Sequence, residues 1–245
     1  MRDWLAAAVL DSSVNLPEGA EGYVLGRGLT YSLMEEMRVG VWIPPSDPAP
    51  DSTFRYRYGD SGNRLEGWLV FPVWAPRGRL VGVEFRRWDG EKEVNKHFLP
   101  DVSWSPAFMG LTPSSLNRIW DGGDVWLVEG VFDLALAHVV PAGDAVLACG
   151  GAKITRSQLS FLQRFMGSNA VVHVAFDMDE TGQKMVHGYQ HPDTGRRVWG
   201  VVERLEKAGV RAQPVTYRGG KDPGEIWEVG GASSLRRSFA LGGLY

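Results

Sequence analysis

The sequence predicts an α/β protein in which a parallel sheet flanked by helices follows a small α+β subdomain. From about Asp124, short apolar runs alternate with helical segments, which is the pattern of a parallel sheet with helical crossovers. Before that point, apolar runs follow one another with a tight turn between them, which favours antiparallel pairing. We therefore predict a first unit over residues 1–121 and a second unit over residues 122–245, the second ending in a helical tail.

Composition narrows the class of protein. The 245 residues suffice for one large core or two modest ones, and 44% hydrophobic with 22% charged residues is typical of a soluble globular protein. No apolar run approaches the roughly 20 residues that span a bilayer, so we expect a cytoplasmic protein without membrane contact. Residues 1–10 superficially resemble a signal peptide, but Asp3 and Asp11 bracket a short apolar stretch, which favours an amphipathic helix.

In the first unit, residues 1–45 are helical and rich in turns by pattern, and Thr30 is a predicted N-cap. Prolines and a polar segment between residues 44 and 64 indicate loops around a short strand. A turn at residues 75–78 joins two longer strands. The predicted elements are a helix over 31–38 and strands over 54–58, 68–74, 80–85 and 94–99.

In the second unit, strands and helices alternate. The stretch 189–195 contains a proline and a glycine and interrupts what would otherwise be one long helix over 182–208, so we interpret it as a surface loop or hairpin insertion. The predicted strands are 125–128, 145–148, 170–176 and 211–216, and the predicted helices are 131–139, 155–166, a stretch from about 181 and a short helix after 225.

Three acidic segments carry most of the functional information. The first two directly follow predicted strands, and residues past the carboxyl ends of parallel strands line the ligand crevice. Carboxylates delivered from separate strands repel one another unless a cation lies between them, and Mg²⁺ prefers oxygen ligands. The segments therefore predict a metal-dependent phosphoryl-transfer site. They are Glu129-Gly130-Val131-Phe132-Asp133, Asp177-Met178-Asp179-Glu180-Thr181-Gly182 and Lys221-Asp222-Pro223-Gly224-Glu225.

Spacing within the first two segments supports this interpretation. Glu129 precedes Gly130 at a strand-to-helix turn, where the absence of a Cβ lets a substrate come close. Asp177 and Asp179 leave a strand at alternate positions, so their side chains lie on one side and are spaced to share metal ions. Gly182 permits a tight entry into the following helix.

The third segment places Asp222 beside Lys221 in a turn made rigid by proline. It is not a phosphate-binding P-loop, because the residue after Lys221 is Asp222 rather than serine or threonine. Taken singly, Asp133 or Glu225 fits a solvated turn and a helix N-cap better than a functional role. The three segments together, in this order, favour function.

A zinc site is not expected. Cys149 is the only cysteine, which excludes an intrachain disulfide and a four-cysteine zinc site. His187 and His191 have i, i+4 spacing, but Gly188 stands where a zinc-protease helix has glutamate, and no third ligand is evident.

The acidic segments resemble the Toprim domain, which type IA and type II topoisomerases, DnaG-like primases, OLD-family nucleases and recombination mediators share. The resemblance covers residues 123–230. It implies that Glu129 is the acid of the first motif, that Asp177 and Asp179 are the metal-binding pair, and that Asp222 belongs to the distal acidic motif. The amino-acid sequence of residues 176–184 is especially similar to the corresponding motif of phage primase–helicases.

Segments of the first unit resemble the catalytic core of DnaG-type primases and extend the resemblance to residues 22–230. Arg86 falls where that family keeps a template- or nucleotide-contacting arginine. One departure is the absence of a lysine between Lys96 and Arg118, where the family usually has one. The matching segments are Leu25-Gly26-Arg27-Gly28-Leu29-Thr30, Leu69-Val70-Phe71-Pro72-Val73, Gly78-Arg79-Leu80-Val81-Gly82-Val83, Asn95-Lys96-His97-Phe98-Leu99 and Phe108-Met109-Gly110-Leu111.

The resemblance implies a DNA primase core that synthesises short RNA primers on single-stranded DNA from ribonucleoside triphosphates. It implies Mg²⁺, with Mn²⁺ as a substitute, and no zinc within this chain. A replicative helicase and a separately encoded zinc-binding module are the expected partners, and the location is the host cytoplasm if a phage encodes the protein. The implied metal ligands are Glu129, Asp177, Asp179 and Asp222, and the implied nucleotide or template contacts are Arg27, Arg86, Lys96, Lys153 and Lys221.

Local charge agrees with this, although the net charge is −3. Residues 54–96 hold nine Lys and Arg against six Asp and Glu, and anionic phosphates need such an excess. Solvated strand faces fit Arg77 and Arg79 better, and Trp68, Trp74, Trp88 and Trp104 fit core packing better than base stacking. Two rivals remain open: a Toprim nuclease that uses the same acids to activate water, and a non-catalytic nucleic-acid-binding replication adaptor.

Overall fold

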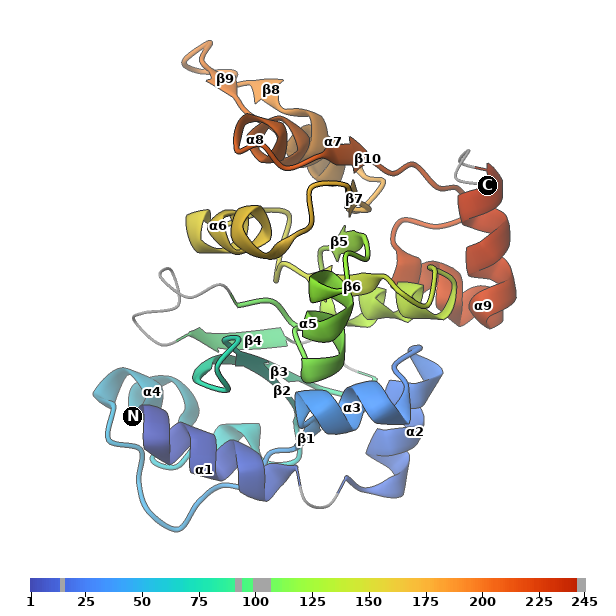
Figure 1. Cartoon of the computed structure of the whole chain (residues 1–245). Helices are drawn as coiled ribbons and strands as arrows, with labels where there is room; N and C mark the ends of the chain where they lie inside the picture. Colours follow the sequence, from blue (N-terminus) through green and yellow to red (C-terminus); the bar gives the residue numbers. More distant parts are fainter. Residues whose placement is uncertain (14–15, 91–93, 99–106, 242–245) are drawn as a thin grey trace.

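The computed structural model describes residues 1–13, 16–90, 94–98 and 107–241, and it contains two four-stranded sheets (Figure 1). The first sheet is antiparallel with the order β1-β2-β3-β4, and the second is parallel with the order β10-β7-β5-β6. The predicted fold class is thereby confirmed. The predicted division between residues 121 and 122 stays a prediction.

The first unit packs helices on both faces of its sheet. Residues of α1 and α4, such as Leu5 and Phe54, share a core with Val83 and Phe85 on one face. On the other face, Phe71 belongs to a core that continues into the second unit. The strands are β1 (Gly40–Val41), β2 (Leu69–Trp74), β3 (Leu80–Arg86) and β4 (Val94–Phe98), and the helices are α1 (Arg2–Ser12), α2 (Glu18–Gly26), α3 (Tyr31–Met37), α4 (Ser52–Tyr58) and the 3₁₀ turn η1 (Asn63–Leu65).

The expected strand over 54–58 is wrong, because these residues belong to helix α4. The segment alternates aromatic and arginine residues, which imitates the two-residue period of a strand. Only Phe54 and Tyr58, four residues apart on one helical face, are buried, whereas Tyr56 is 87% exposed. Asp51 caps the helix, since its Oδ1 accepts a hydrogen bond from the Phe54 backbone N at 2.7 Å.

The second unit is a three-layered arrangement around the parallel sheet. Phe161 and Leu205, from α6 and α8, pack with Leu127 on one face, and Leu134 and Phe239, from η3 and α9, pack on the other. The strands are β5 (Val125–Val128), β6 (Ala145–Ala148), β7 (Val172–Val174) and β10 (Ala212–Pro214), and the helices are η3 (Val131–His138), α6 (Arg156–Phe165), α7 (Glu180–His187), α8 (Val201–Lys207) and α9 (Pro223–Leu241). Helix α5 (Pro113–Trp120) precedes residue 122 in the chain but packs with this core through Leu116 and Ile119, so it is described with the second unit.

The predicted strands and helices of this unit are present, and several of them are shorter than predicted. The predicted helix over 131–139 is a 3₁₀ helix, and the expected short C-terminal helix is the first part of α9, whose backbone leaves helical geometry at Gly230 and Gly231. The insertion is a hairpin of β8 (Tyr189–Gln190) and β9 (Arg197–Val198), which projects from the far end of α7 and α8 in Figure 1. None of the described helices combines the length and hydropathy that a bilayer crossing requires.

The cap of α4 gives a first prediction. We expect Asp51→Ala to lower the free energy of unfolding by about 1 kcal/mol, because the Phe54 N–H loses its partner. Asp51→Asn should stay close to the parent protein, since asparagine caps helices as well as aspartate does. Urea denaturation followed by circular dichroism measures both, and equal stability of Asp51→Ala and the parent would contradict the capped helix.

Candidate active site

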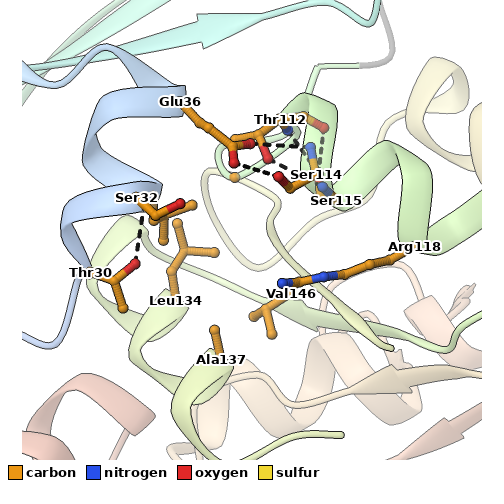
Figure 2. A pocket seen from close by; sticks show the side chains of 12 residues that line it. Thr30, Ser32, Glu36, Thr112, Ser114, Ser115, Arg118, Leu134, Ala137 and Val146 are labelled. Carbon is orange, nitrogen blue, oxygen red and sulfur yellow. Dashed lines mark hydrogen bonds between the residues drawn. The ribbon is translucent and has the colours of Figure 1, made fainter. Parts of the chain in front are cut away.

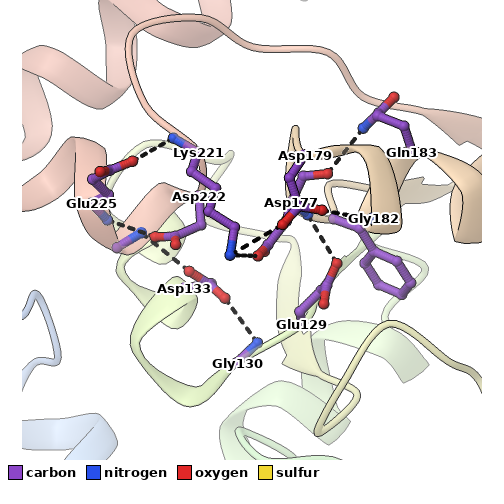
Figure 3. Close-up of polar contacts among 12 residues, drawn as sticks. Glu129, Gly130, Asp133, Asp177, Asp179, Gly182, Gln183, Lys221, Asp222 and Glu225 are labelled. Carbon is purple, nitrogen blue, oxygen red and sulfur yellow. Dashed lines mark hydrogen bonds and ion pairs between the residues drawn. The ribbon is translucent and has the colours of Figure 1, made fainter. Parts of the chain in front are cut away.

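The three acidic segments meet at the carboxyl edge of the parallel sheet, as Figure 3 shows. Glu129 directly follows β5, and Asp177 lies three residues past the end of β7. The third segment ends the connection between β10 and α9 and continues into the first turn of α9. Because β5 and β7 are neighbouring parallel strands, their carboxyl ends open at the same place.

The turn after β7 is held against Glu129. The backbone N of Asp177 donates to Glu129 Oε1 at 3.1 Å, and the backbone N of Gly182 donates to Asp179 Oδ1 at 2.8 Å, which caps α7. A Cβ on Gly182 would lie 2.2 Å from the Asp177 carbonyl O and 3.0 Å from Glu129 Oε1. Only glycine allows this approach, as the sequence predicted.

The third segment closes on the second through backbone groups and one lysine. The backbone N of Met178 donates to the Lys221 carbonyl at 2.7 Å, and the Tyr217 hydroxyl donates to the carbonyls of Phe176 and Lys221 at 3.0 and 3.1 Å. The Lys221 ammonium then lies 3.0 Å from Asp177 Oδ2 and 3.2 Å from Asp179 Oδ2. The cation that the repelling carboxylates require is therefore supplied by the chain itself.

Asp133 is more than the solvated cap expected from the sequence. It is only 7% exposed, and its two carboxylate oxygens accept from the backbone N of Gly130 at 2.8 Å and of Gly224 at 3.2 Å. It thus caps η3, as expected, and also fastens the first acidic segment to the third. Its position between Phe132 and Leu134 in an apolar run is the sequence signal that could have indicated burial. Glu225 is exposed and accepts from the Lys221 backbone N at 2.5 Å.

Burial and mutual repulsion shift the proton affinities of these acids. Burial, together with the charge of Asp177, raises the pKa of Glu129 to about 7. Burial and Asp222 raise the pKa of Asp133, and burial raises that of Asp177 despite Lys221. The pKa of Asp179 is lowered, chiefly by the Gly182 N–H. The pKa of Lys221 is raised by its hydrogen bonds to the two aspartates, so the ammonium stays charged.

These residues fit a divalent metal ion in donor chemistry. Carboxylate oxygens are the ligands that Mg²⁺ and Mn²⁺ take, and the ammonium between Asp177 and Asp179 marks a place where positive charge is stabilised. Within the described ranges, no three acid, histidine or cysteine side chains are already gathered as a metal cluster. Metal binding at this pair would therefore have to displace the Lys221 ammonium.

The predicted cations of the first unit face these acids. A cavity of about 260 Å³ is lined by Arg27, Arg86 and Lys96 on one side and by Glu129 and Asp177 on the other, with Asp222 beside them. An adjoining cavity of about 520 Å³ extends it past Arg87 to Lys221 and Glu228. We call the two together the cleft. Lys153 is exposed and is not among the residues that line these cavities.

Phe132, from the first acidic segment, joins the two walls of the cleft. Its ring packs against Phe71 and Tyr23 at centroid distances of 5.6 and 5.8 Å. The guanidinium groups of Arg27 and Arg86 lie 4.6 and 5.0 Å from its centroid. Phe132, four residues past the end of β5, thus contacts two cations of the other unit.

The loop that carries Arg27 is pinned to the second unit. The Trp227 indole N–H donates to the Gly26 carbonyl at 3.0 Å, and His138 Nε2 is 2.9 Å from the Gly28 carbonyl. Gly28 has φ +91°, and a Cβ there would lie 2.5 Å from that of Ala135. Glycine is therefore required by conformation and by close packing at this junction.

A further cavity of about 170 Å³ lies between α3 and α5 (Figure 2). Glu36 accepts hydrogen bonds there from the backbone N of Ser114 at 3.1 Å and from the Ser114 hydroxyl. Desolvation opposes this contact but the hydrogen bonds prevail, and the pKa of Glu36 is lowered. These hydrogen bonds join the last turn of α3 to the first turn of α5.

The tryptophans behave as packing residues. The indole N–H groups of Trp74 and Trp88 donate to the carbonyls of Met37 and Gly67 at 3.1 and 2.8 Å, and Trp68 packs against the first-unit core. These three tryptophans therefore have partners within the fold, as expected for packing residues. The predictions for Trp104, Lys92 and Leu99 fall outside the described residues.

Comparison with known proteins places these observations in a class. Residues 126–227 match the Toprim-like family model, so this part of the chain is a Toprim-like domain. No curated protein matches the sequence. Several solved structures of primase catalytic cores match, and the chain has their fold across both units.

Three of these structures illustrate the likeness. The Aquifex aeolicus primase, comprising zinc-binding and RNA polymerase domains, is 24% identical with a TM-score of 0.60, covering 95% of this chain but 60% of that one. The RNA polymerase domain of Mycobacterium tuberculosis DnaG is 19% identical with a TM-score of 0.62, covering 97% and 82%. A DnaG primase catalytic domain bound to single-stranded DNA is 16% identical with a TM-score of 0.60, covering 98% and 79%.

The raised pKa of Glu129 makes stability depend on pH when metal is removed. Below about pH 4.5 the carboxyl is protonated in both states, and between about 4.5 and 7 only the unfolded chain ionises. The free energy of unfolding therefore falls across this range and levels off above it.

We expect Glu129→Gln, which keeps an acceptor for the Asp177 N–H, to lose this part of the pH dependence. Thermal unfolding of both proteins in EDTA between pH 4 and pH 8 measures it, because all other titrating groups are shared. Parallel curves for the two proteins would contradict the raised pKa.

Proposed function

We propose that this chain is a DNA primase catalytic core that transfers ribonucleotides to a growing primer on a single-stranded DNA template. The observation that carries the proposal is the cleft in which the cations of an antiparallel first unit face the acids of a Toprim-like second unit. The similarity to primase cores over both units supports it, and a DnaG primase catalytic domain solved with single-stranded DNA supports the class of template.

In this reaction the 3′-hydroxyl of the primer attacks the α-phosphorus of a nucleoside triphosphate in line, a phosphodiester forms, and pyrophosphate leaves. A bound Mg²⁺ or Mn²⁺, held by Asp177 and Asp179 with Glu129 or Asp222, would neutralise phosphate charge and lower the pKa of the hydroxyl. Glu129 is suited by its position at the end of β5 either to hold this metal or to receive the hydroxyl proton.

Positive side chains on the opposite wall would bind the anionic substrates. Arg27, Arg86 and Lys96 line the cleft and are suited to template and triphosphate oxygens. Lys221 would exchange its two aspartates for phosphate oxygens when metal is present. Lys153 is a weaker candidate for a substrate contact, because it is not among the residues that line the cleft. A replicative helicase and a zinc-binding module stay the predicted partners.

The acids themselves are tested by removing charge while keeping shape. We expect Asp177→Asn and Asp179→Asn to lose at least about 100-fold of primer synthesis on single-stranded DNA with Mg²⁺. Asparagine can still cap α7 at residue 179, so both variants should unfold within about 1 kcal/mol of the parent.

Asp193→Asn, in the exposed insertion, is the matched control and should keep full activity. The same incubation, scored for template cleavage, separates the alternatives. Cleavage without primers would favour a Toprim nuclease, and binding without either reaction would favour a replication adaptor. Near-normal synthesis by both site variants would contradict the assignment of the acids.

The opposite wall is tested by binding. Arg86→Ala should weaken single-stranded DNA binding and reduce the slope of log affinity against log salt by about 0.7, the value for one lost phosphate contact. Lys96→Ala should do the same. Arg77→Ala, an exposed arginine in the hairpin turn of the same unit, is the control. If the slope of log affinity against log salt were the same in all three variants, Arg86 and Lys96 would not be phosphate contacts.

A further inference from the structure

We propose that Glu84 is a positioning residue of the cleft: a buried carboxylate that fixes Arg86 and Lys96 and sets the net charge they present to a polyanion. The inference rests on the proposed function for what the two cations hold, but its central measurement is binding rather than synthesis.

Glu84 is an unusual residue for its place in the fold. It lies within β3, where its Cα neighbours are Phe71 on β2 and Lys96 on β4, and its side chain is 0% exposed. A carboxylate removed from water costs several kcal/mol unless opposite charges and hydrogen bonds compensate. An apolar residue would serve the core at this position more simply. A buried carboxylate at this position therefore suggests a role beyond packing, and its two cationic neighbours indicate which role.

Each oxygen of Glu84 faces one cation. Arg86 lies two residues along the same face of β3, and its Nε donates to Glu84 Oε1. Lys96 lies directly opposite on β4, and its ammonium is 3.1 Å from Glu84 Oε2. Among the described residues Oε2 has no hydrogen bond of good geometry, so the charge of Lys96 is its main compensation.

The two cations are held at their far ends by the second unit. The Lys96 ammonium also donates to the Gly150 carbonyl, just past β6, at 3.1 Å. The Arg86 guanidinium lies over the Phe132 ring. Glu84 therefore contacts both cations in the first sheet, and these cations in turn contact the second unit near the edge where the acids lie.

Exposure separates the roles of the three side chains. Arg86 and Lys96 are 22% and 33% exposed and line the cleft, whereas Glu84 is fully covered behind them. Glu84 cannot touch a template or triphosphate in this arrangement. It acts through the cations, halving their summed charge from two to one and limiting the orientations they adopt.

This assignment predicts opposite effects on binding and on turnover. Glu84→Gln keeps the volume but removes the charge, so the cations become freer and jointly more positive. Single-stranded DNA should then bind at least as tightly, with a salt slope steeper by up to about 0.7. Primer synthesis at saturating template should fall about tenfold or more, because the cations are no longer held in one geometry. A residue that served only the core would leave the salt slope unchanged.

The experiment compares Glu84→Gln with two controls, each checked by thermal unfolding. Glu66→Gln removes one exposed carboxylate of the same unit and tests for a general charge effect. Glu84→Asp keeps the buried charge and should keep the parent salt slope. If Glu84→Gln does not fold, Glu84→Gln combined with Lys96→Met removes the buried carboxylate together with the ammonium opposite it. Its slope should be steeper than that of Lys96→Met alone by up to about 0.7, because Arg86 then has no buried counter-charge.

The outcomes are distinct. A steeper slope in Glu84→Gln alone, with reduced turnover, supports the proposal. Slopes that are the same in Glu84→Gln and Glu66→Gln overturn it, as does a double variant whose slope equals that of Lys96→Met alone. If the parent protein makes no primers, the proposed function fails while the salt slopes still decide the role of Glu84.

Discussion

Repulsion among carboxylates at the carboxyl edge of the parallel sheet is the constraint on which the rest of the structure depends. The fold brings Glu129, Asp177 and Asp179 together at one edge, and each is stabilised differently. Burial and the charge of Asp177 raise the pKa of Glu129 to about 7, and the two aspartates share the Lys221 ammonium. The backbone contacts from Met178 and Tyr217 keep that lysine's segment in place. The arrangement of side chains at this edge therefore favours positive charge.

The opposite wall of the cleft has the complementary organisation. Arg27 pairs with Glu228, and Arg86 and Lys96 share the buried Glu84. Positive groups are thus held by the chain's own carboxylates before any polyanion arrives. Under the proposed function, a phosphate that entered the cleft would compete with these carboxylates for the same cations.

Phe132 connects the two walls mechanically. It follows the first acidic residue by three positions, packs with Phe71 and Tyr23 of the first unit, and lies beneath two guanidinium groups. The same short segment therefore supplies the acid at the strand end and the apolar contact that sets the distance to the cations. Packing at this ring and charge placement in the cleft are coupled for that reason.

Local pattern was sufficient for much of the protein. Strands 125–128 and 145–148, the turn at 75–78 and the need for glycine at 182 follow from periodicity and from hard-sphere contact, which nearby residues decide. Pattern failed at residues 54–58, where alternation imitates a strand and the Asp51 cap with a buried i, i+4 pair makes a helix. It also undervalued Asp133, whose second partner, Gly224, lies 91 residues away.

The sequence by itself determined the fold class, the acids and the edge at which they gather, because the direction of parallel strands places their carboxyl ends together. Only the tertiary structure decided which charges meet: that Lys221 lies between Asp177 and Asp179, that Glu84 is buried behind Arg86 and Lys96, and that Lys153 lies outside the cleft. Charge pairing depends on distances of a few ångströms between segments far apart in the chain, and on burial that sets the strength of each pair. Neither quantity is encoded in local spacing.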